Sequence, residues 1–284
     1  LYLILSIYSF ALLASLFIYF NYSNSNFYIG EAITKSWNSK VSSCWQNFNN
    51  NKKLGCHHPS NSNEKIVLIG DSHASQLWIG LNKIFKDRYD VVILTSELLD
   101  DNYESWFKEN QQVFIENYLS EHNVKYIIFA MAQHHLIPNK IQILNTTPDK
   151  KIKIISFINN IHSLASKMNI KFVISDDTPR LSMDLPITTC VKQYKKFKES
   201  DCDVSKKDAL KTRLNLSDLI NIFKKNGFMT YDPFNIICPT SNCSLMMADK
   251  PLYIDQNHVS SYGSYLIAKD MKKVCAKKSP SSET

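Results

Sequence analysis

Short apolar runs and helical patterns alternate along the chain from about Lys65 onward, and this alternation constrains the fold more than any other feature. The runs are rich in Val, Ile, Phe and Tyr and are too short for buried helices, so they predict strands covered on both faces. Strands that alternate with helices pair in parallel, because each helix returns the chain to the same end of the sheet. The predicted strands are 66–69, 89–96, 125–132, 170–177 and 228–232, and the predicted helices are about 71–85, 109–123, 152–169, 208–226 and the segment after His258. We therefore expect an α/β fold, a three-layer α/β/α sandwich around a mostly parallel five-stranded sheet, with residues 178–207 as a loop insertion.

Residues 1–21, LYLILSIYSFALLASLFIYFN, are nearly all apolar and carry no charge. Their length matches the roughly 20 residues that cross a bilayer as a helix, and tyrosines near both ends suit the membrane interfaces. They predict a transmembrane helix; a cleaved signal peptide is the alternative, although a basic start and a clear cleavage site are missing. Since the chain starts at Leu1, we expect it to be the tail of a longer membrane protein. Residues 22–64 would then form a linker with a disulfide-pinned loop, 65–276 the α/β domain and 277–284 a disordered tail.

The seven cysteines indicate a compartment outside the cytoplasm. Six of them fall into local pairs flanked by loop-forming residues, and none has the C-x-x-C spacing of a zinc or redox site. Disulfides that close such loops persist in oxidising compartments. Cys275 would remain a buried free thiol, and the Cys56-His57-His58 sequence lacks further ligands for a metal, so no metal is expected. The expected bridges are Cys44–Cys56, Cys190–Cys202 and Cys238–Cys243, with other connectivities left open by the sequence.

The net charge is +7 at pH 7, and lysines gather in residues 192–198, 206–213 and 269–278. Such runs usually form solvated helix faces. Nucleic-acid binding would need a groove-fitting motif or aromatic residues between the basic ones, and the sequence has neither. We therefore expect no nucleic-acid partner; attraction to an anionic membrane surface or polysaccharide remains open.

The stretch KIVLIGDSHASQLWIGL, residues 65–81, places a hydroxyl at the end of the first predicted strand. Gly70 permits a tight turn that a Cβ would obstruct. Ser72 then lies at the carboxyl end of a strand and beside a helix N-terminus, where open α/β sheets bind ligands. This position favours a nucleophile; the alternative is that Asp71 and Ser72 only cap the helix.

The stretch LYIDQNHVSSYGSYLIAKDM, residues 252–271, places an acid and an imidazole just before the last predicted helix. Asp255 and His258 are three positions apart, so a tight turn or a first helical turn brings the carboxylate to the imidazole. Asp255 could orient His258, and His258 could remove the proton of Ser72. The alternative is a helix-capping acid followed by a partly exposed histidine.

Taken together, Gly-Asp-Ser at the first strand and Asp-x-x-His before the last helix resemble the SGNH (GDSL-like) hydrolase superfamily, in which these residues are nucleophile, acid and base. The resemblance covers Leu1 to about Ala276, and within that superfamily the chain is similar to the carboxy-terminal SGNH domain of acyltransferase-3 family membrane O-acyltransferases. It is carried, in this order and after a terminal transmembrane span, by IGDSHASQLW, DTPRLSMDLPITTCV, DPFNIICPTSNCS and LYIDQNHVSSYGSYLIA.

This resemblance implies a bacterial inner-membrane protein whose SGNH domain lies on the periplasmic side. A membrane domain, expected as the missing N-terminal part of the same polypeptide, would pass an acyl group outward, usually acetyl from acetyl-CoA. The SGNH domain binds no cofactor of its own and would place the acyl group on a hydroxyl of an envelope glycan such as lipopolysaccharide, O-antigen or peptidoglycan. The alternatives are an anchored carbohydrate esterase or deacetylase with the same Ser72-His258-Asp255 triad, and a glycan-binding module without activity.

Other positions near the motifs have less specific roles. The backbone N–H of Ser72 is one candidate oxyanion donor. The resemblance implies a further donor, an Asn at the end of the third predicted strand, but no Asn stands there. Gln133 is the candidate donor in its place. His73 matches the GDSH form of the acyltransferase-linked domains and either lines the pocket or caps the helix. Asp71 is expected to bond turn N–H groups. Arg180 is expected either to contact the substrate or to lie on the surface. His134 and His135 are expected to lie on the surface. Asp176 and Asp177 are expected to cap a turn.

Overall fold

The computed structural model describes residues 62–94, 109–132, 148–180, 204–211, 214–248, 250–255 and 257–276. The predicted transmembrane segment 1–21, most of the linker and the tail lie outside these residues, as do Gln133 and the cysteines at 44, 56, 190 and 202. None of the helices in the described ranges combines the length and the apolar character needed to cross a membrane.

A five-stranded sheet forms the centre of the domain, and all of its neighbouring strands are parallel. The predicted sheet is therefore confirmed. Its strands, in the order in which they lie side by side, are β2 (Asp90–Leu94), β1 (Lys65–Gly70), β3 (Val124–Ala130), β4 (Lys171–Ser175) and β6 (Met229–Tyr231).

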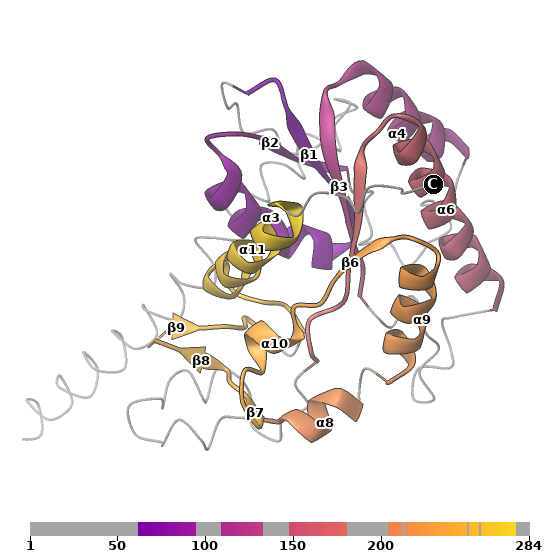
Figure 1. Cartoon of the computed structure of the whole chain (residues 1–284). Helices are drawn as coiled ribbons and strands as arrows, with labels where there is room; N and C mark the ends of the chain where they lie inside the picture. The colour runs from indigo at the N-terminus through magenta and orange to yellow at the C-terminus, as the bar shows by residue number, and fades with distance from the viewer. Residues whose placement is uncertain are drawn as a thin grey trace, which may run out of the picture.

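Helices cover both faces of the sheet, as Figure 1 shows. One face carries α3 (Ser72–Phe85) and α11 (Ser261–Ala276). The other carries α4 (Glu109–Glu121), α6 (Pro148–Lys167) and α9 (Leu214–Lys225). Alternate residues of β1 enter the two cores, with Ile66 and Leu68 on the α3 side and Val67 and Ile69 on the other. This two-sided burial explains why the strand is a continuous apolar run rather than an alternating one.

The order of the strands places a topological switch point at β1. The chain leaves β1 through α3 to reach β2 on one side, and then passes through α4 to reach β3 on the other side. Both crossover connections have the same hand but run in opposite directions along the sheet, so their helices cover opposite faces. A crevice therefore opens between these two connections, at the carboxyl ends of β1 and β3. Ser72 follows this end of β1 after Asp71, so the fold places it where α/β sheets bind ligands.

Helices α3 and α11 lie side by side because a glycine lets their backbones approach (Figure 1). A Cβ on Gly80 would lie 2.1 Å from the carbonyl oxygen of Ser264, and the N–H of Gly80 donates to Ser264 Oγ at 2.9 Å. Since α3 begins at Ser72 and α11 follows His258, this close packing brings the two parts of the chain that carry the motifs into one place.

Small elements at the carboxyl edge depart from the sequence expectation. The single helix predicted over 208–226 is wrong: the structure has α8 (Lys206–Lys211) and α9, which run in different directions (Figure 1). The predicted insertion also ends earlier, because β5 (Val204–Ser205) pairs with β7 (Asn242–Cys243). This long-range pairing is tertiary and leaves no local periodicity. The remaining elements are α10 (Phe234–Ile237), β8 (Met246–Met247) and β9 (Lys250–Pro251).

Two predictions about cysteines fall within the described residues. Cys238 and Cys243 form a disulfide, as expected from their spacing. Cys275 is a buried free thiol in α11, also as expected. Its burial raises the pKa to about 11, so the thiol stays protonated and unreactive at neutral pH.

Candidate active site

Asp71 joins the ends of two neighbouring strands beneath Ser72. It is the N-cap of α3, where its Oδ1 accepts the N–H of His73 at 2.7 Å, while its Oδ2 accepts the N–H of Ala132 at 2.9 Å. Burial is the largest influence on this carboxyl group and raises its pKa. Asp71 therefore has the structural role that the sequence indicated, and it fixes the first turn of α3 relative to the end of β3.

Ser72, His258 and Asp255 lie in one hydrogen-bonded series. His258 Nε2 is 2.9 Å from Ser72 Oγ, and His258 Nδ1 is 2.7 Å from Asp255 Oδ2. The second oxygen of Asp255 accepts the backbone N–H groups of Asn257 at 2.9 Å and His258 at 2.7 Å. The structure therefore brings together three residues that are up to 186 positions apart in the sequence.

The carboxylate of Asp255 stays ionised at neutral pH. Partial burial raises its pKa, but the hydrogen bond from the His258 side chain and the two backbone N–H groups outweigh burial and hold the pKa below its usual value. An ionised acid on Nδ1 keeps the proton of the imidazole at that nitrogen and leaves Nε2 free to accept one. This is the arrangement that general-base activation of a hydroxyl needs.

The turn that carries Asp255 and His258 is exposed to solvent on one side and hydrogen-bonded to α3 on the other. The side chains of Asp255 and His258 are 49% and 20% exposed, so small molecules can reach them. Behind them, the N–H of Val259 donates to Gln76 Oε1 of α3 at 2.7 Å, and Gln76 is buried. The sequence did not single out Gln76, because only the fold shows that a polar side chain on the inner face of α3 meets a backbone N–H.

A second histidine, His73, is buried directly beside the series. Its Nδ1 is 2.5 Å from Asp177 Oδ1, and its ring centroid is 5.0 Å from that of His258. Burial lowers the pKa of His73, but the charge and hydrogen bond of Asp177, with the charges of Asp71 and Asp255, raise it to about 9. At neutral pH His73 is therefore an imidazolium, which the sequence did not predict.

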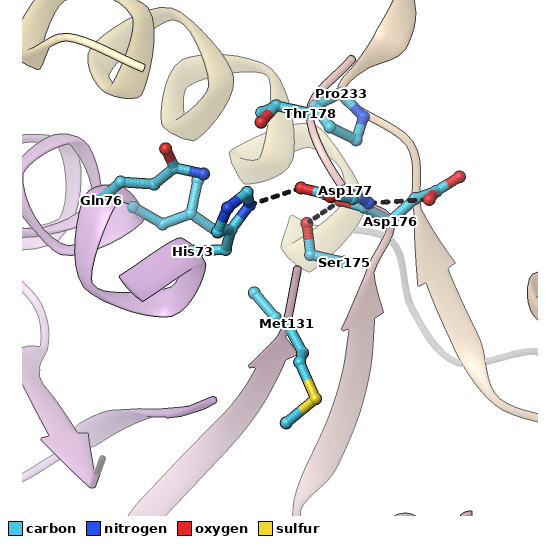
Figure 2. Close-up of a pocket in the computed structure, with 10 residues that line it drawn as sticks. His73, Gln76, Met131, Ser175, Asp176, Asp177, Thr178 and Pro233 are labelled. Carbon is cyan, nitrogen blue, oxygen red and sulfur yellow. Dashed lines mark hydrogen bonds and ion pairs between the residues drawn. The ribbon is translucent and has the colours of Figure 1, made fainter. Parts of the chain in front are cut away.

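The two acids at the end of β4 differ in role. Asp176 Oδ1 accepts the N–H of Asp177, which is the turn-capping that the sequence indicated. For Asp177 that prediction is incomplete, because its carboxylate binds His73 from 104 positions away. Figure 2 shows His73 on α3 pointing at Asp177, which follows the end of β4.

A small hollow borders His73, and Figure 2 shows residues that line it. Ser72 and His258 are not among the described residues that line it. It is lined by His73, Gln76, Leu77, Ala130, Met131, Ser175, Asp176, Asp177, Thr178 and Pro233. His73 lines this hollow, and its expected place in the substrate pocket stays a prediction.

The remaining predicted positions carry less structural information. Arg180 is partly exposed in the segment that follows β4, and its role in substrate binding stays a prediction. Gln133, His134 and His135 lie outside the described residues. Within the ranges that the structure describes, no group of three or more His, Cys, Asp or Glu side chains is arranged to hold a metal ion.

Comparison with known proteins shows which family and which solved structures this chain resembles. A family described as "SGNH domain (fused to AT3 domains)" matches residues 43–273. The solved periplasmic domain of a lipopolysaccharide acetyltransferase from Salmonella ser. Paratyphi A has a TM-score of 0.57 and 14% identity, with 90% of this chain and 97% of that chain covered. A putative SGNH hydrolase from Slackia heliotrinireducens gives a TM-score of 0.48 and 13% identity over 74% of this chain and 98% of that one. No curated protein matches the chain.

The family match spans most of the chain and includes both motif segments. The Salmonella domain shares the fold at low identity. The chain therefore belongs to the family of SGNH domains that are fused to AT3 domains.

Proposed function

We propose that this domain transfers an acyl group, most simply acetyl, through Ser72 onto a hydroxyl of a cell-envelope glycan. The observation that carries the proposal is the hydrogen-bonded series of Ser72, His258 and Asp255 at the switch point of the sheet. The family description supports an AT3 membrane domain as the partner that supplies the acyl group. We place the domain on the periplasmic side of the inner membrane, with acetyl-CoA as the ultimate acyl donor on the other side.

The first half of the reaction loads the serine. His258 Nε2 takes the proton of Ser72 Oγ while that oxygen attacks the acyl carbonyl of the donor. Asp255 stabilises the imidazolium that results. The tetrahedral intermediate collapses, His258 returns the proton to the leaving oxygen or sulfur, and an acyl-Ser72 ester remains.

The second half uses the same groups in reverse. The glycan hydroxyl gives its proton to His258 Nε2 and attacks the acyl carbonyl of acyl-Ser72. When the bond to Ser72 Oγ breaks, His258 returns the proton to Ser72, and the acyl group leaves as an ester of the sugar. Each oxyanion needs hydrogen-bond donors, and we propose the N–H of Ser72 as one of them. The N–H groups in the first turn of a helix have no intrahelical acceptor and form the positive end of the helix dipole.

Hydrolysis is the second candidate, because the exposed side of His258 admits water as well as a sugar. Water in place of the glycan hydroxyl would make the same triad an esterase or deacetylase. The two activities differ in the direction of acyl flow, so one experiment separates them.

The experiment uses membranes that contain the full-length protein, radiolabelled acetyl-CoA and the isolated envelope glycan. The proposal predicts ester-linked label on the glycan that accumulates with time. Release of free acetate from a pre-acetylated glycan, with no label gained by the unmodified glycan, would contradict transfer and support the esterase.

Asp255→Asn tests the orienting acid. Asparagine keeps the shape but can present an N–H to Nδ1, which favours the wrong imidazole tautomer. We expect the turnover number to fall by about 1,000-fold or more, with the apparent affinity for the acceptor little changed. The measurement is steady-state transfer in the membrane assay, and a turnover number within about 3-fold of wild type would contradict the role.

A further inference from the structure

His73 and Asp177 are a buried ion pair that the transfer mechanism does not use. The side chains are 3% and 4% exposed, and the two residues lie on different elements, α3 and the segment that follows β4. A charge pair this far from water carries a large desolvation cost, which a purely apolar contact would avoid. The presence of such a pair one residue from the nucleophile suggests a role at the site.

An imidazolium has two N–H donors, and the second donor of His73 faces the catalytic turn. The side-chain amide nitrogen of Asn257 is 3.3 Å from His73 Nε2. Because the two ends of an amide differ little in shape, a half-turn of the side chain presents Asn257 Oδ1 to the N–H instead. With His73 charged, that orientation completes a chain of hydrogen bonds from Asp177 through His73 to Asn257.

Asn257 in turn belongs to the turn that aims His258. Its N–H donates to Asp255 Oδ1, and its carbonyl oxygen accepts the hydroxyl of Thr178 at 3.1 Å. Asp177 and Thr178 are consecutive, so the segment after β4 holds the side chain of Asn257 through His73 and its backbone carbonyl directly through Thr178. A shift of this turn moves Asp255 and His258 together relative to Ser72.

We propose that His73, charged by Asp177, is a positioning residue that holds Asn257 and thereby keeps His258 Nε2 within reach of Ser72 Oγ. The inference rests on the proposed function, because it assumes that Ser72 is acylated. The charged and titratable groups that face His73 are Asp71 before α3, Asp176 and Asp177 after β4, and Asp255 and His258 in the turn.

The proposal makes Ser72 reactivity depend on pH in a defined direction. The pKa of His73 is raised to about 9, so the imidazolium is present below that pH and is lost as the pH rises through it. Removal of the Asp177 charge removes the largest influence that raises this pKa. The alkaline decline of Ser72 reactivity should therefore move to lower pH in Asp177→Asn.

The test measures acylation of Ser72 in the full-length protein by p-nitrophenyl acetate between pH 6 and pH 10, with the Ser72→Ala rate subtracted as background. We expect His73→Gln and Asp177→Asn to lower the maximal acylation rate at pH 7.5 by about 100-fold, the cost of a misplacement near 1 Å. The concentration of probe that gives half the maximal rate should stay unchanged, since the proposal has both side chains act through Asn257 and not on the ester.

Asp90→Asn is the matched control. Asp90 is a buried acid paired with Lys65 at 3.3 Å, at the opposite end of the sheet. This variant also removes a buried carboxylate, so it reproduces a general loss of stability, but it should keep the wild-type rate and pH profile. The proposal would be overturned if Asp177→Asn and Asp90→Asn gave equal acylation rates of Ser72 and if these rates declined at the same alkaline pH.

A second measurement covers the case in which Asp177→Asn does not fold. In wild-type protein labelled with ¹⁵N-histidine, both ring nitrogens of His73 should carry protons at pH 7.5, and a neutral ring at that pH would overturn the proposal. If the wild-type Ser72 does not react with the ester, the proposed function fails instead, and the nuclear magnetic resonance titration still decides the state of His73.

Discussion

Replacing Ser72 with Ala should abolish acylation of the envelope glycan, with a fall in transfer of at least about 1,000-fold. The substitution removes one oxygen atom and leaves His258 without the hydroxyl that it approaches at 2.9 Å. No acyl-enzyme ester can then form on α3, and the second half of the reaction has no substrate. The measurement is the ester content of the glycan in cells that carry the full-length variant, with the protein level in membranes quantified alongside.

Ser75→Ala is the control for this result. Ser75 is a buried serine one turn further along α3, and its hydroxyl bonds locally, to the carbonyl of Asp71 at 3.4 Å. The same chemical change there should leave glycan acylation within about 3-fold of wild type. A Ser72→Ala strain whose glycan is acylated at the wild-type level, with the control also active, would remove Ser72 from the reaction.

Gly70→Ala should have the largest effect on stability and destabilise the domain by more than about 4 kcal/mol. A Cβ added at Gly70 would lie 1.7 Å from the carbonyl oxygen of Ala130, which is backbone and has no flexible end that could move aside. Gly70 also has a φ of +150°, which L side chains rarely adopt. The turn beneath Ser72 would have to separate from β3, so we expect a loss of cooperative unfolding or a midpoint near ambient temperature by circular dichroism.

Gly227→Ala separates the clash from the strain of a positive φ. Gly227 has a φ of +83°, but a Cβ there would meet nothing within 4 Å. Only the backbone strain remains, which costs about 1 kcal/mol. If Gly70→Ala and Gly227→Ala lowered the free energy of unfolding equally, the close approach of β1 and β3 beneath the serine would be wrong.

The sheet was predictable because its strands are buried on both faces and therefore appear as continuous apolar runs. Residues 66–69 and 125–132 carry this signal without ambiguity, and the helices between them supply the crossovers that make the sheet parallel. The region around α8 was not predictable. Its short strand β5 exists because it pairs with β7, 37 positions away from Ser205 to Asn242, and such pairing leaves no periodicity in the local sequence.

The site was predictable where one motif contains its own geometry. Asp255 and His258 are three residues apart and share a turn, and Ser72 follows a strand end, so local rules placed each of them. The contacts of His73 and Gln76 were not predictable from the sequence. Their partners, Asp177 after β4 and Val259 before α11, are distant in the sequence and lie next to α3 only in the folded domain. Sequence rules describe an acid after a strand as a turn cap, and only the tertiary structure shows which buried cation it faces.

The most direct test of the account is to look for an acyl group on Ser72 itself. Membranes with the full-length protein would be given labelled acetyl-CoA without glycan acceptor, quenched in acid, digested and analysed by tandem mass spectrometry. The account predicts an acetyl ester on the peptide that contains Ser72, which disappears when the glycan is added before the quench. Glycan that becomes acetylated while this serine stays unmodified under both conditions would contradict the account.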